Sequence, residues 1–487
     1  MKKDNKAKSK SSSKAIGIDW DWNLGGETAQ HCGLTASDIA ALDEAIGRHG
    51  KRCVRVHPET DTAALPFATE AVPWYPQGRF LIDSSIRPGA FLDYAVGEYY
   101  IQDAASLLPM AIADIKPGEE VCDLCASPGG KSTAALERLR GSGYVLANEV
   151  IRGRVDVLQM ALARSRYDNF AVSSQSPETL AESCAELFDC VIVDAPCTGQ
   201  SMVARGKQSL ASYSQRQVEH SALRQLSILR SAVRLVRPGG RLIYSTCTFA
   251  HAENEAVVAS MLQWLPDWQM IERPELQTWK SGAMDGCYRL WPQRDGCSGG
   301  FAVGLVRPEA STFESLDRFE ATSLSSPSSS GRDDAVSHRR SGSSFHWSPG
   351  PATISWEGNP FEDWAAGDAR LFVRAHELHA FHRDIPERSI DAALSGFPLG
   401  DLFGPWWVPH HAMACVDSIG GRPLKRRTIE LSKSEAIRFM GGESWRGSGD
   451  AVRAVACYGG KSLGWMKHTG ERLQNHLPKS LRGHYLA

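Results

Sequence analysis

The sequence predicts an α/β fold, in which a mostly parallel sheet is covered by helices on both faces. Five short apolar runs of strand length alternate with longer stretches of helical pattern across the middle of the chain. This alternation is typical of a parallel sheet, because parallel strands are joined by helix-length crossovers. We expect strands at 121–125, 144–148, 170–174, 190–194 and 241–246, and helices that include 132–140, 153–166 and 216–236.

Length and composition narrow the class of protein. At about 150 residues per domain, the 487 residues suggest roughly three folding units. A hydrophobic content of 42% and a charged content of 23% exclude wholesale disorder. No apolar run approaches the roughly 18 residues of a membrane span, and the N-terminus lacks a secretory signal. Twelve irregularly spaced cysteines do not form a disulfide framework, so we expect a cytoplasmic, monomeric enzyme that binds no membrane.

Composition shifts divide the chain into segments. Residues 1–14 hold six lysines and one aspartate, which predicts a disordered basic tail. Residues 309–351 are rich in Ser, Pro and Gly, and so few apolar side chains cannot offset the entropy of ordering. This stretch is therefore predicted to be a flexible linker. The remaining segments, 15–89, 90–308 and 352–487, are expected to fold.

A glycine loop follows the first expected strand, at the sheet edge where parallel sheets bind ligands. Its paired glycines let backbone amides approach a ligand closely, and the N-terminus of the next helix favours a negative group. The loop is not a P-loop, because Cys125 stands at the first glycine position and Pro128 removes an amide. The candidate binding residues are Cys125, Ala126, Ser127, Pro128, Gly129, Gly130 and Lys131.

An acidic residue, Glu149, follows the second expected strand, 20 residues after Gly129. A carboxylate at this position accepts hydrogen bonds from the ribose hydroxyls of an adenosine-containing ligand. An adenosyl cofactor without phosphates suits a loop that lacks P-loop geometry. On these residues alone, a tight turn and an exposed glutamate without a ligand remain the alternative.

Two cysteines follow the fourth and fifth expected strands. Cys197 lies in the run DAPCTG, which begins at Asp194, and Cys247 lies in STCTF. A single cysteine is usually a small buried apolar residue, but two at equivalent strand ends favour reactive thiols. Cys122 and Cys125 form a C-x-x-C pair without a partner pair, so we expect no metal site.

The motifs DLCASPGGKST, DAPCTG and STCTFAHAENEAVV occur in this order and resemble the Sun-type (Nol/Nop/Sun) RNA cytosine-5 methyltransferases. Near the C-terminus, LGWMKHTGERLQNHLPKSLR is similar to the RNA-binding extension of the ribosomal small-subunit methyltransferase F subgroup. The resemblance implies a Rossmann-like class I methyltransferase core at 90–308. It also implies a small α+β N-terminal RNA-binding region at 15–89 and a C-terminal PUA-like RNA-binding region at 352–487.

The same resemblance implies the cofactor and the partner. The cofactor would be S-adenosylmethionine, held by residues 125–131, Glu149 and Asp194. The partner would be RNA, with a cytidine of small-subunit (16S) ribosomal RNA, or of the small ribosomal subunit, as the target. Transfer RNA is an alternative substrate. A non-catalytic RNA-binding ribosome-assembly factor on the same fold is a further alternative.

Four side chains receive catalytic roles from the resemblance. Cys247 would attack C6 of the cytosine ring as a thiolate and so activate C5. Asp194 would hydrogen-bond the pyrimidine edge, and Cys197 would help to remove the C5 proton and release the enzyme. Lys131 would lower the pKa of the thiol through its positive charge.

Two features concern cofactor and RNA binding. The family has an acid after the third strand, where this chain has no acid at the equivalent position near Ser176.

From residue 422 to 482 there are 13 Lys/Arg and 5 Asp/Glu, with Trp445, Tyr458 and Trp465 interleaved. This pattern favours phosphate contact together with base stacking.

Overall fold

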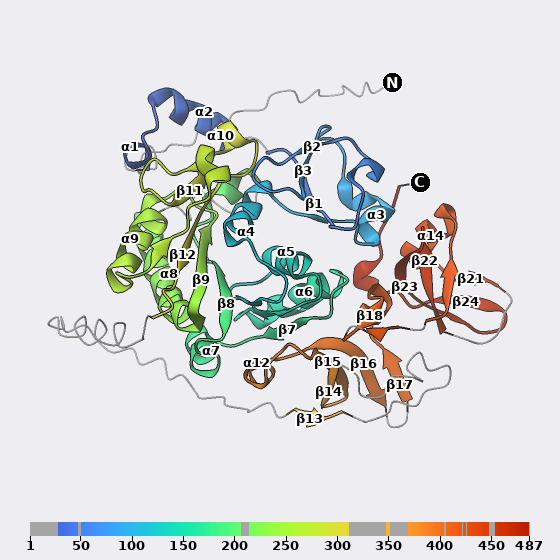
Figure 1. The fold of residues 1–487 in the computed structure, drawn as a ribbon. Coiled ribbons are helices and arrows are strands. Elements are labelled where there is room, and N and C mark those ends of the chain that lie inside the picture. The colour runs from blue at the N-terminus through green and yellow to red at the C-terminus, as the bar shows by residue number, and fades with distance from the viewer. Residues whose placement is uncertain are drawn as a thin grey trace, which may run out of the picture.

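The structure is a computed structural model in which three groups of strands and helices surround a central sheet (Figure 1). No helix within the described part of the chain is both long and apolar enough to cross a membrane. The predicted tail at 1–14, and most of the predicted linker, lie outside the described residues. These are 28–46, 50–205, 214–310, 347–350, 369–403, 406–420, 422–424, 426–447 and 453–486.

The central sheet has eight strands in the order β10-β12-β9-β8-β5-β6-β7, with β11 paired to β12. Strands β5 to β9 are parallel and β12 is antiparallel to β9, so the predicted mostly parallel sheet is confirmed. Each of the five expected strands overlaps one of the parallel strands. The bounds are β5 Glu120–Asp123, β6 Tyr144–Asn148, β7 Phe170–Ser173, β8 Phe188–Asp194, β9 Val236–Thr246, β10 Gln269–Met270, β11 Cys287–Leu290 and β12 Gly300–Val306.

Helices cover both faces of this sheet because its strands are apolar on both sides. Val121 of β5 packs in the layer of α4, α5 and α6, whereas the adjacent Cys122 packs in the layer of α7, α8 and α9. The three expected helices correspond to α5, α6 and α8. The bounds are α4 Leu108–Ala113, α5 Gly130–Leu139, α6 Arg152–Ala163, α7 Pro177–Ser183, α8 Gln215–Leu235 and α9 Glu255–Trp264.

An antiparallel sheet of order β2-β3-β1-β4 forms most of the N-terminal region. The boundary predicted at residue 90 falls inside this region, because β4 pairs with β1 and so belongs to the N-terminal sheet. Buried Arg55 on β1 makes two hydrogen bonds of 2.6 and 2.9 Å to Glu137 on α5 and fastens this sheet to the core. The bounds are α1 Ala29–Cys32, α2 Ala36–Ile46, β1 Cys53–Val56, β2 Thr69–Ala71, β3 Gly78–Leu81, α3 Leu92–Ala95 and β4 Tyr99–Ile101.

The C-terminal region contains two five-stranded sheets. The first includes β13, which lies within the predicted linker, and is continuous with the core because Val172 of β7 pairs with Ser395. The bounds are β13 Ser348–Pro349, β14 Ala369–Arg374, β15 Glu377–His382, β16 Phe397–Phe403 and β17 Trp406–Pro409, with α12 Glu387–Ala392 and α13 Ala412–Cys415.

The second C-terminal sheet packs against the N-terminal region, where Leu92 and Val96 join its hydrophobic cluster. A capping box at Ser432 and Glu435 begins its helix α14. The bounds are β20 Thr428–Glu430, β21 Trp445–Arg446, β22 Arg453–Tyr458, β23 Lys461–His468, β24 Arg472–Asn475 and α14 Lys433–Met440, preceded by the pair β18 Ser418–Ile419 and β19 Arg422–Pro423.

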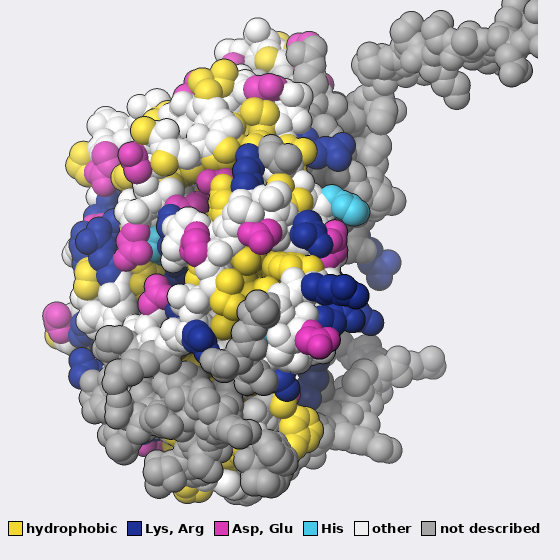
Figure 2. All heavy atoms as spheres, turned by 90° about the vertical axis from the view of Figure 1, so that its right-hand side faces the viewer, with side chains coloured by type: hydrophobic (Ala, Val, Ile, Leu, Met, Phe, Trp, Pro, Cys, Tyr) yellow, Lys and Arg dark blue, Asp and Glu magenta, His cyan; other side chains and the backbone are white. Residues whose placement is uncertain are grey.

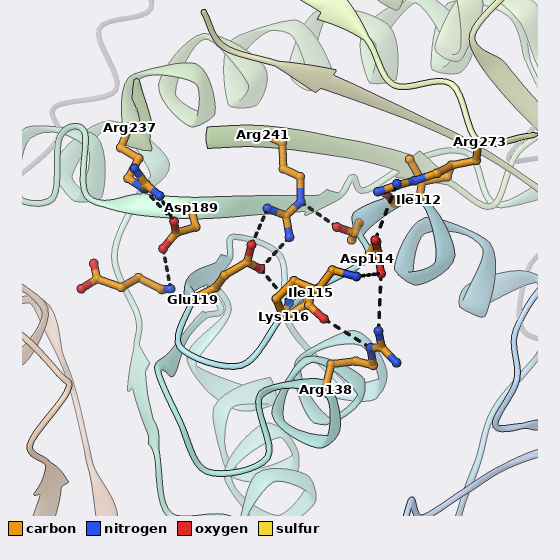
Figure 3. A network of polar contacts seen from close by, with 12 residues as sticks. Ile112, Asp114, Ile115, Lys116, Glu119, Arg138, Asp189, Arg237, Arg241 and Arg273 are labelled. Carbon is orange, nitrogen blue, oxygen red and sulfur yellow. Dashed lines mark hydrogen bonds and ion pairs between the residues drawn. The ribbon is translucent and has the colours of Figure 1, made fainter. Parts of the chain in front are cut away.

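A network of ion pairs connects the amino-terminal ends of the central strands (Figure 3). Arg241 of β9 makes two hydrogen bonds of 2.9 and 2.6 Å to Glu119, just before β5. Asp114, at the end of α4, pairs with Lys116 at 2.7 Å. These charges therefore brace the sheet at the edge opposite to that where parallel sheets bind ligands.

Candidate active site

The positions predicted after the strands meet at one pocket of about 500 Å³ at the carboxyl edge of the central sheet. This convergence follows from topology, because β8, β5 and β6 are neighbours and β9 lies beside β8. Residues from four different strand ends therefore face the same space. The pocket walls include Cys125, Ser127, Glu149, Asp194, Cys197 and Cys247.

The two cysteine sulfurs form a contact pair. Cys197 Sγ and Cys247 Sγ lie 3.4 Å apart. A hydrogen bond from the Cys197 thiol lowers the pKa of Cys247 below its ordinary value of 9.0, although burial acts in the opposite direction. The same hydrogen bond, together with burial, raises the pKa of Cys197 well above 9.0. These opposite shifts favour the thiolate form at Cys247 and the thiol form at Cys197.

Lys131 and Asp194 form an ion pair next to the cysteines, with Nζ and Oδ2 2.6 Å apart. Lys131 is nearly buried in the first turn of α5, whereas the Asp194 side chain is 40% exposed and lines the pocket. The Ser245 hydroxyl donates to the other oxygen of Asp194 at 2.8 Å. The positive charge of Lys131 also contributes to the lowered pKa of Cys247.

The glycine loop divides its residues between the pocket wall and the turn behind it. Cys125 and Ser127 line the pocket, whereas Pro128 lines a separate cavity of about 240 Å³. Gly129 has φ +108°, and a Cβ there would lie 2.8 Å from the Cβ of Ala161 on α6, so this position requires glycine. Burial raises the pKa of the Cys125 thiol, which favours an unreactive neutral thiol.

Glu149 is 4% exposed and lies at the pocket wall. Its Oε1 accepts a hydrogen bond from the Ile151 amide at 2.8 Å, and its Oε2 lies 3.3 Å from Nη1 of Arg154. Arg154 also donates to the Ser127 carbonyl at 2.7 Å and so connects the glutamate to the glycine loop. Arg154 was not predicted from the sequence, because an arginine in the first turn of a helix is usually a solvated side chain.

A glutamate on the helix that follows the third parallel strand also lines the pocket. Neither residue near the missing acid lines the pocket: Ser176 caps α7 through Thr179, and the Gln175 side chain donates to the Ala392 carbonyl at 2.8 Å. Glu178, in the first turn of α7, lines the pocket instead. The displacement by two residues explains why a position-by-position comparison of sequences misses it.

The prediction that Trp445, Tyr458 and Trp465 stack on bases is wrong for Trp465. Trp465 is 4% exposed and its Nε1 donates to the His410 carbonyl at 2.9 Å, so it belongs to the core. Trp445 and Tyr458 are half-buried, and Arg438 lies 5.3 Å from the Trp445 ring centroid. On the face of the molecule in Figure 2, Lys and Arg side chains are interspersed with Asp and Glu.

A metal site has no candidate in the described part of the chain. No group of three or more His, Cys, Asp or Glu residues there is arranged to hold a metal ion.

The chain is similar to known methyltransferases along most of its length. The family model described as 16S rRNA methyltransferase RsmB/F matches residues 110–306, and that of the methyltransferase RsmF PUA domain matches residues 426–483. The ribosomal RNA small subunit methyltransferase F of Erwinia tasmaniensis is 28% identical over 446 residues, 85% of each chain. The enzyme of the same name from Klebsiella pneumoniae is 28% identical over 429 residues, 84% of each chain.

A solved structure agrees with these relatives. A methyltransferase homologue from Pyrococcus horikoshii matches with a TM-score of 0.50 and 25% identity, over 57% of this chain and 93% of that one. The resemblance to a Rossmann-like methyltransferase core and a PUA module is thereby confirmed. The chain is similar to the 16S rRNA methyltransferase RsmB/F family across its core and to the RsmF PUA domain near its C-terminus.

Proposed function

We propose that this protein transfers a methyl group from S-adenosylmethionine to C5 of a cytidine in small-subunit ribosomal RNA. The observation that carries the proposal is the cysteine pair, whose sulfurs lie 3.4 Å apart in the pocket that Glu149 also lines. A thiolate with a neighbouring thiol suits a reaction that begins with nucleophilic addition and ends with removal of a proton. The names of the relatives support ribosomal RNA as the substrate.

The residues at the pocket fit S-adenosylmethionine. A volume of about 500 Å³ lies within the usual range of roughly 300–1,000 Å³ for small-molecule sites. Glu149 offers carboxylate oxygens for ribose hydroxyls, and Val150 and Ile151 provide partly exposed apolar surface beside it. Residues 125–131, Glu149 and Asp194 would hold the cofactor, which supplies an electrophilic methyl group when it is bound.

Cys247 carries the first step. Cytosine C5 is a weak nucleophile, so the Cys247 thiolate adds to C6, forms the S–C6 bond and releases the C5=C6 π electrons toward C5. Asp194 hydrogen-bonds the pyrimidine edge, where its charge stabilises the protonated ring during attack. Lys131 holds Asp194 in place at 2.6 Å and favours the thiolate form of Cys247.

Cys197 carries the last step. Once Cys247 is bonded to C6, it no longer accepts the hydrogen bond that keeps the proton on Cys197. Loss of this acceptor lowers the pKa of Cys197, although burial still acts in the opposite direction, and the proton that Cys197 releases passes to water. The resulting thiolate takes the C5 proton, the electrons of that bond restore C5=C6, and the S–C6 bond breaks to release Cys247 as a thiolate.

RNA binding is assigned to the regions that flank the core. We assign RNA contact to the N-terminal region, 15–89, and to the C-terminal region, 352–487, whose residues 426–483 match a PUA domain. Because stacking hides the faces of a paired base, the target cytidine must be unstacked or flipped to reach Cys247.

Methyl transfer can be tested directly with tritiated S-adenosylmethionine and small ribosomal subunits, naked 16S ribosomal RNA or transfer RNA. We expect label in ribosomal RNA, recovered as 5-methylcytidine. Cys247→Ala should reduce turnover by at least 1,000-fold, on the order of the loss when a catalytic nucleophile is removed, while cofactor binding stays within about threefold. Label in transfer RNA alone, or turnover retained by Cys247→Ala, contradicts the proposal.

A further inference from the structure

Both reactive cysteines are followed by a threonine that is bound to the same buried carboxylate, that of Glu253. Glu253 is 0% exposed and lies just before α9, beneath the pocket. Its Oε2 accepts the Thr198 amide at 3.0 Å, and its Oε1 accepts the Thr198 and Thr248 hydroxyls. The loops that carry Cys197 and Cys247 are thus joined at one point.

Both carboxylate oxygens of Glu253 accept more than one hydrogen bond. Oε2 also accepts the side-chain amide of Gln225, on α8, at 2.9 Å. Four donors from three elements therefore surround two oxygens. Burial raises the pKa of Glu253, and the hydrogen bonds from Thr198, Gln225 and Thr248 act in the opposite direction. Asn254 reinforces the loop, because it accepts from the Thr246 hydroxyl at 2.6 Å and donates to the Thr248 carbonyl at 3.0 Å.

We propose that Glu253 is a positioning residue that sets the separation of the Cys197 and Cys247 sulfurs by holding the residue after each cysteine. It touches neither sulfur directly, so it acts through Thr198 and Thr248. The role in methyl transfer rests on the proposed function, whereas the geometric role does not.

The cysteine separation can be measured as the rate of disulfide formation with diamide. In this reaction the Cys197–Cys247 S–S bond forms, while two electrons and both thiol protons pass to the diamide N=N bond. The charged groups that influence the pair are Lys131, Asp194 and Glu253, and none of them is consumed. The purified full-length protein is treated at neutral pH, and the disulfide is identified by mass spectrometry of the linked peptides.

Glu253→Ala removes the carboxylate that joins the two cysteine loops, and it should lower the rate of disulfide formation by at least tenfold. Glu253→Gln should be no slower than wild type, because its oxygen can replace Oε2 while the two threonine hydroxyls rotate to accept from its amide. Ser281→Ala is the matched control: it removes a buried hydroxyl bonded at 2.6 Å to Glu255, a carboxylate that is hydrogen-bonded to neither Thr198 nor Thr248. It should react at the wild-type rate.

Folding is checked through the melting temperature and cofactor binding. Because Glu253→Ala leaves buried donors without an acceptor, Thr248→Val provides a second test that removes only one hydroxyl. It should slow cross-linking about threefold or more. The proposal is overturned if correctly folded Glu253→Ala cross-links at the wild-type rate, if Glu253→Gln is as slow as Glu253→Ala, or if Thr248→Val has no effect.

The methylation assay separates this inference from the proposed function. Glu253→Ala should lower kcat at least tenfold and leave the KM for RNA near its wild-type value, since the residue lies beneath the pocket. Wild-type protein that cross-links readily but methylates no RNA would contradict the proposed function and leave the positioning role intact. A tenfold rise in the KM for RNA, with kcat unchanged, would contradict the positioning role in catalysis.

Discussion

At the scale of single residues, the surroundings decide what each cysteine can do. Burial raises the pKa of Cys125 and, to about 12, that of Cys190, so these thiols stay neutral. Cys247 differs because a neighbouring thiol donates a hydrogen bond to it and Lys131 lies close. The thiol with the lowered pKa is therefore distinguished by its hydrogen-bond donor rather than by its exposure.

Replacing Cys197 with alanine should raise the pKa of Cys247. In the native protein the pKa of Cys247 is below 9.0, so the thiolate already forms at lower pH than in an ordinary cysteine. Without the Cys197 donor, the pH profile of Cys247 alkylation by iodoacetamide should move to higher pH, with slower reaction near neutrality. Peptide mass spectrometry measures the rate, and Cys415→Ser, at a distant free thiol, should leave the profile unchanged.

The same Cys197→Ala variant should also trap the reaction midway. Without a base for the C5 proton, the S–C6 bond cannot break, so a covalent protein–RNA complex should accumulate. Denaturing gel electrophoresis after incubation with RNA and S-adenosylmethionine would show it as a band of reduced mobility. Cys197→Ala/Cys247→Ala should show no band, and its absence from the single variant would remove Cys197 from the release step.

At the scale of elements, adjacent strands bring together groups that are distant in sequence. Cys197 and Cys247 are 50 residues apart but leave the parallel neighbours β8 and β9, whose register pairs Asp194 with Ser245. The N-terminal sheet is joined to this core by Arg55, which is 0% exposed and bonded to Glu137, Gln102 and Thr133.

Arg55→Met should destabilise the protein strongly because it leaves the Glu137 carboxylate buried without its partner. Loss of one member of a buried pair costs about 3–5 kcal/mol. Urea unfolding should show this loss, and Arg55→Met/Glu137→Leu should recover most of it. Lys51→Met, which breaks the exposed pair with Glu70, should change stability by no more than about 1 kcal/mol. Equal losses of unfolding free energy for Arg55→Met and Lys51→Met would contradict a stabilising role for the buried Arg55–Glu137 pair.

At the scale of the whole molecule, the last C-terminal sheet packs against residues near the start of the chain. The last sheet shares a hydrophobic cluster with Leu92 and Val96, and the Leu486 amide donates to the Ala90 carbonyl at 2.8 Å. Lys461 of this sheet also pairs with Glu98 of the N-terminal region. The last C-terminal sheet therefore lies beside α3, just beyond the N-terminal region assigned to RNA binding (Figure 1).

Leu92→Asp should release the C-terminal sheet from the N-terminal region. Leu92 is 3% exposed, and a carboxylate there would be buried among apolar side chains. Limited proteolysis should then cleave the chain between the two C-terminal sheets, and RNA affinity should fall while cofactor binding persists. Ile82→Asp, at a side chain 65% exposed in the same region, is the matched control and should behave as wild type.

By itself, the sequence determined the fold class, the family and the positions of Cys125, Glu149, Asp194, Cys197 and Cys247. These follow from local pattern: strand-length apolar runs, the residues at their ends and motifs in order. The burial of side chains and their hydrogen-bond partners could not be predicted, because one sequence does not show which side chains are in contact. Only the tertiary structure decided that Trp465 is core, that Glu178 lines the pocket and that Glu253 joins the two cysteine loops. The physical reason is that each depends on contacts between segments distant in the chain.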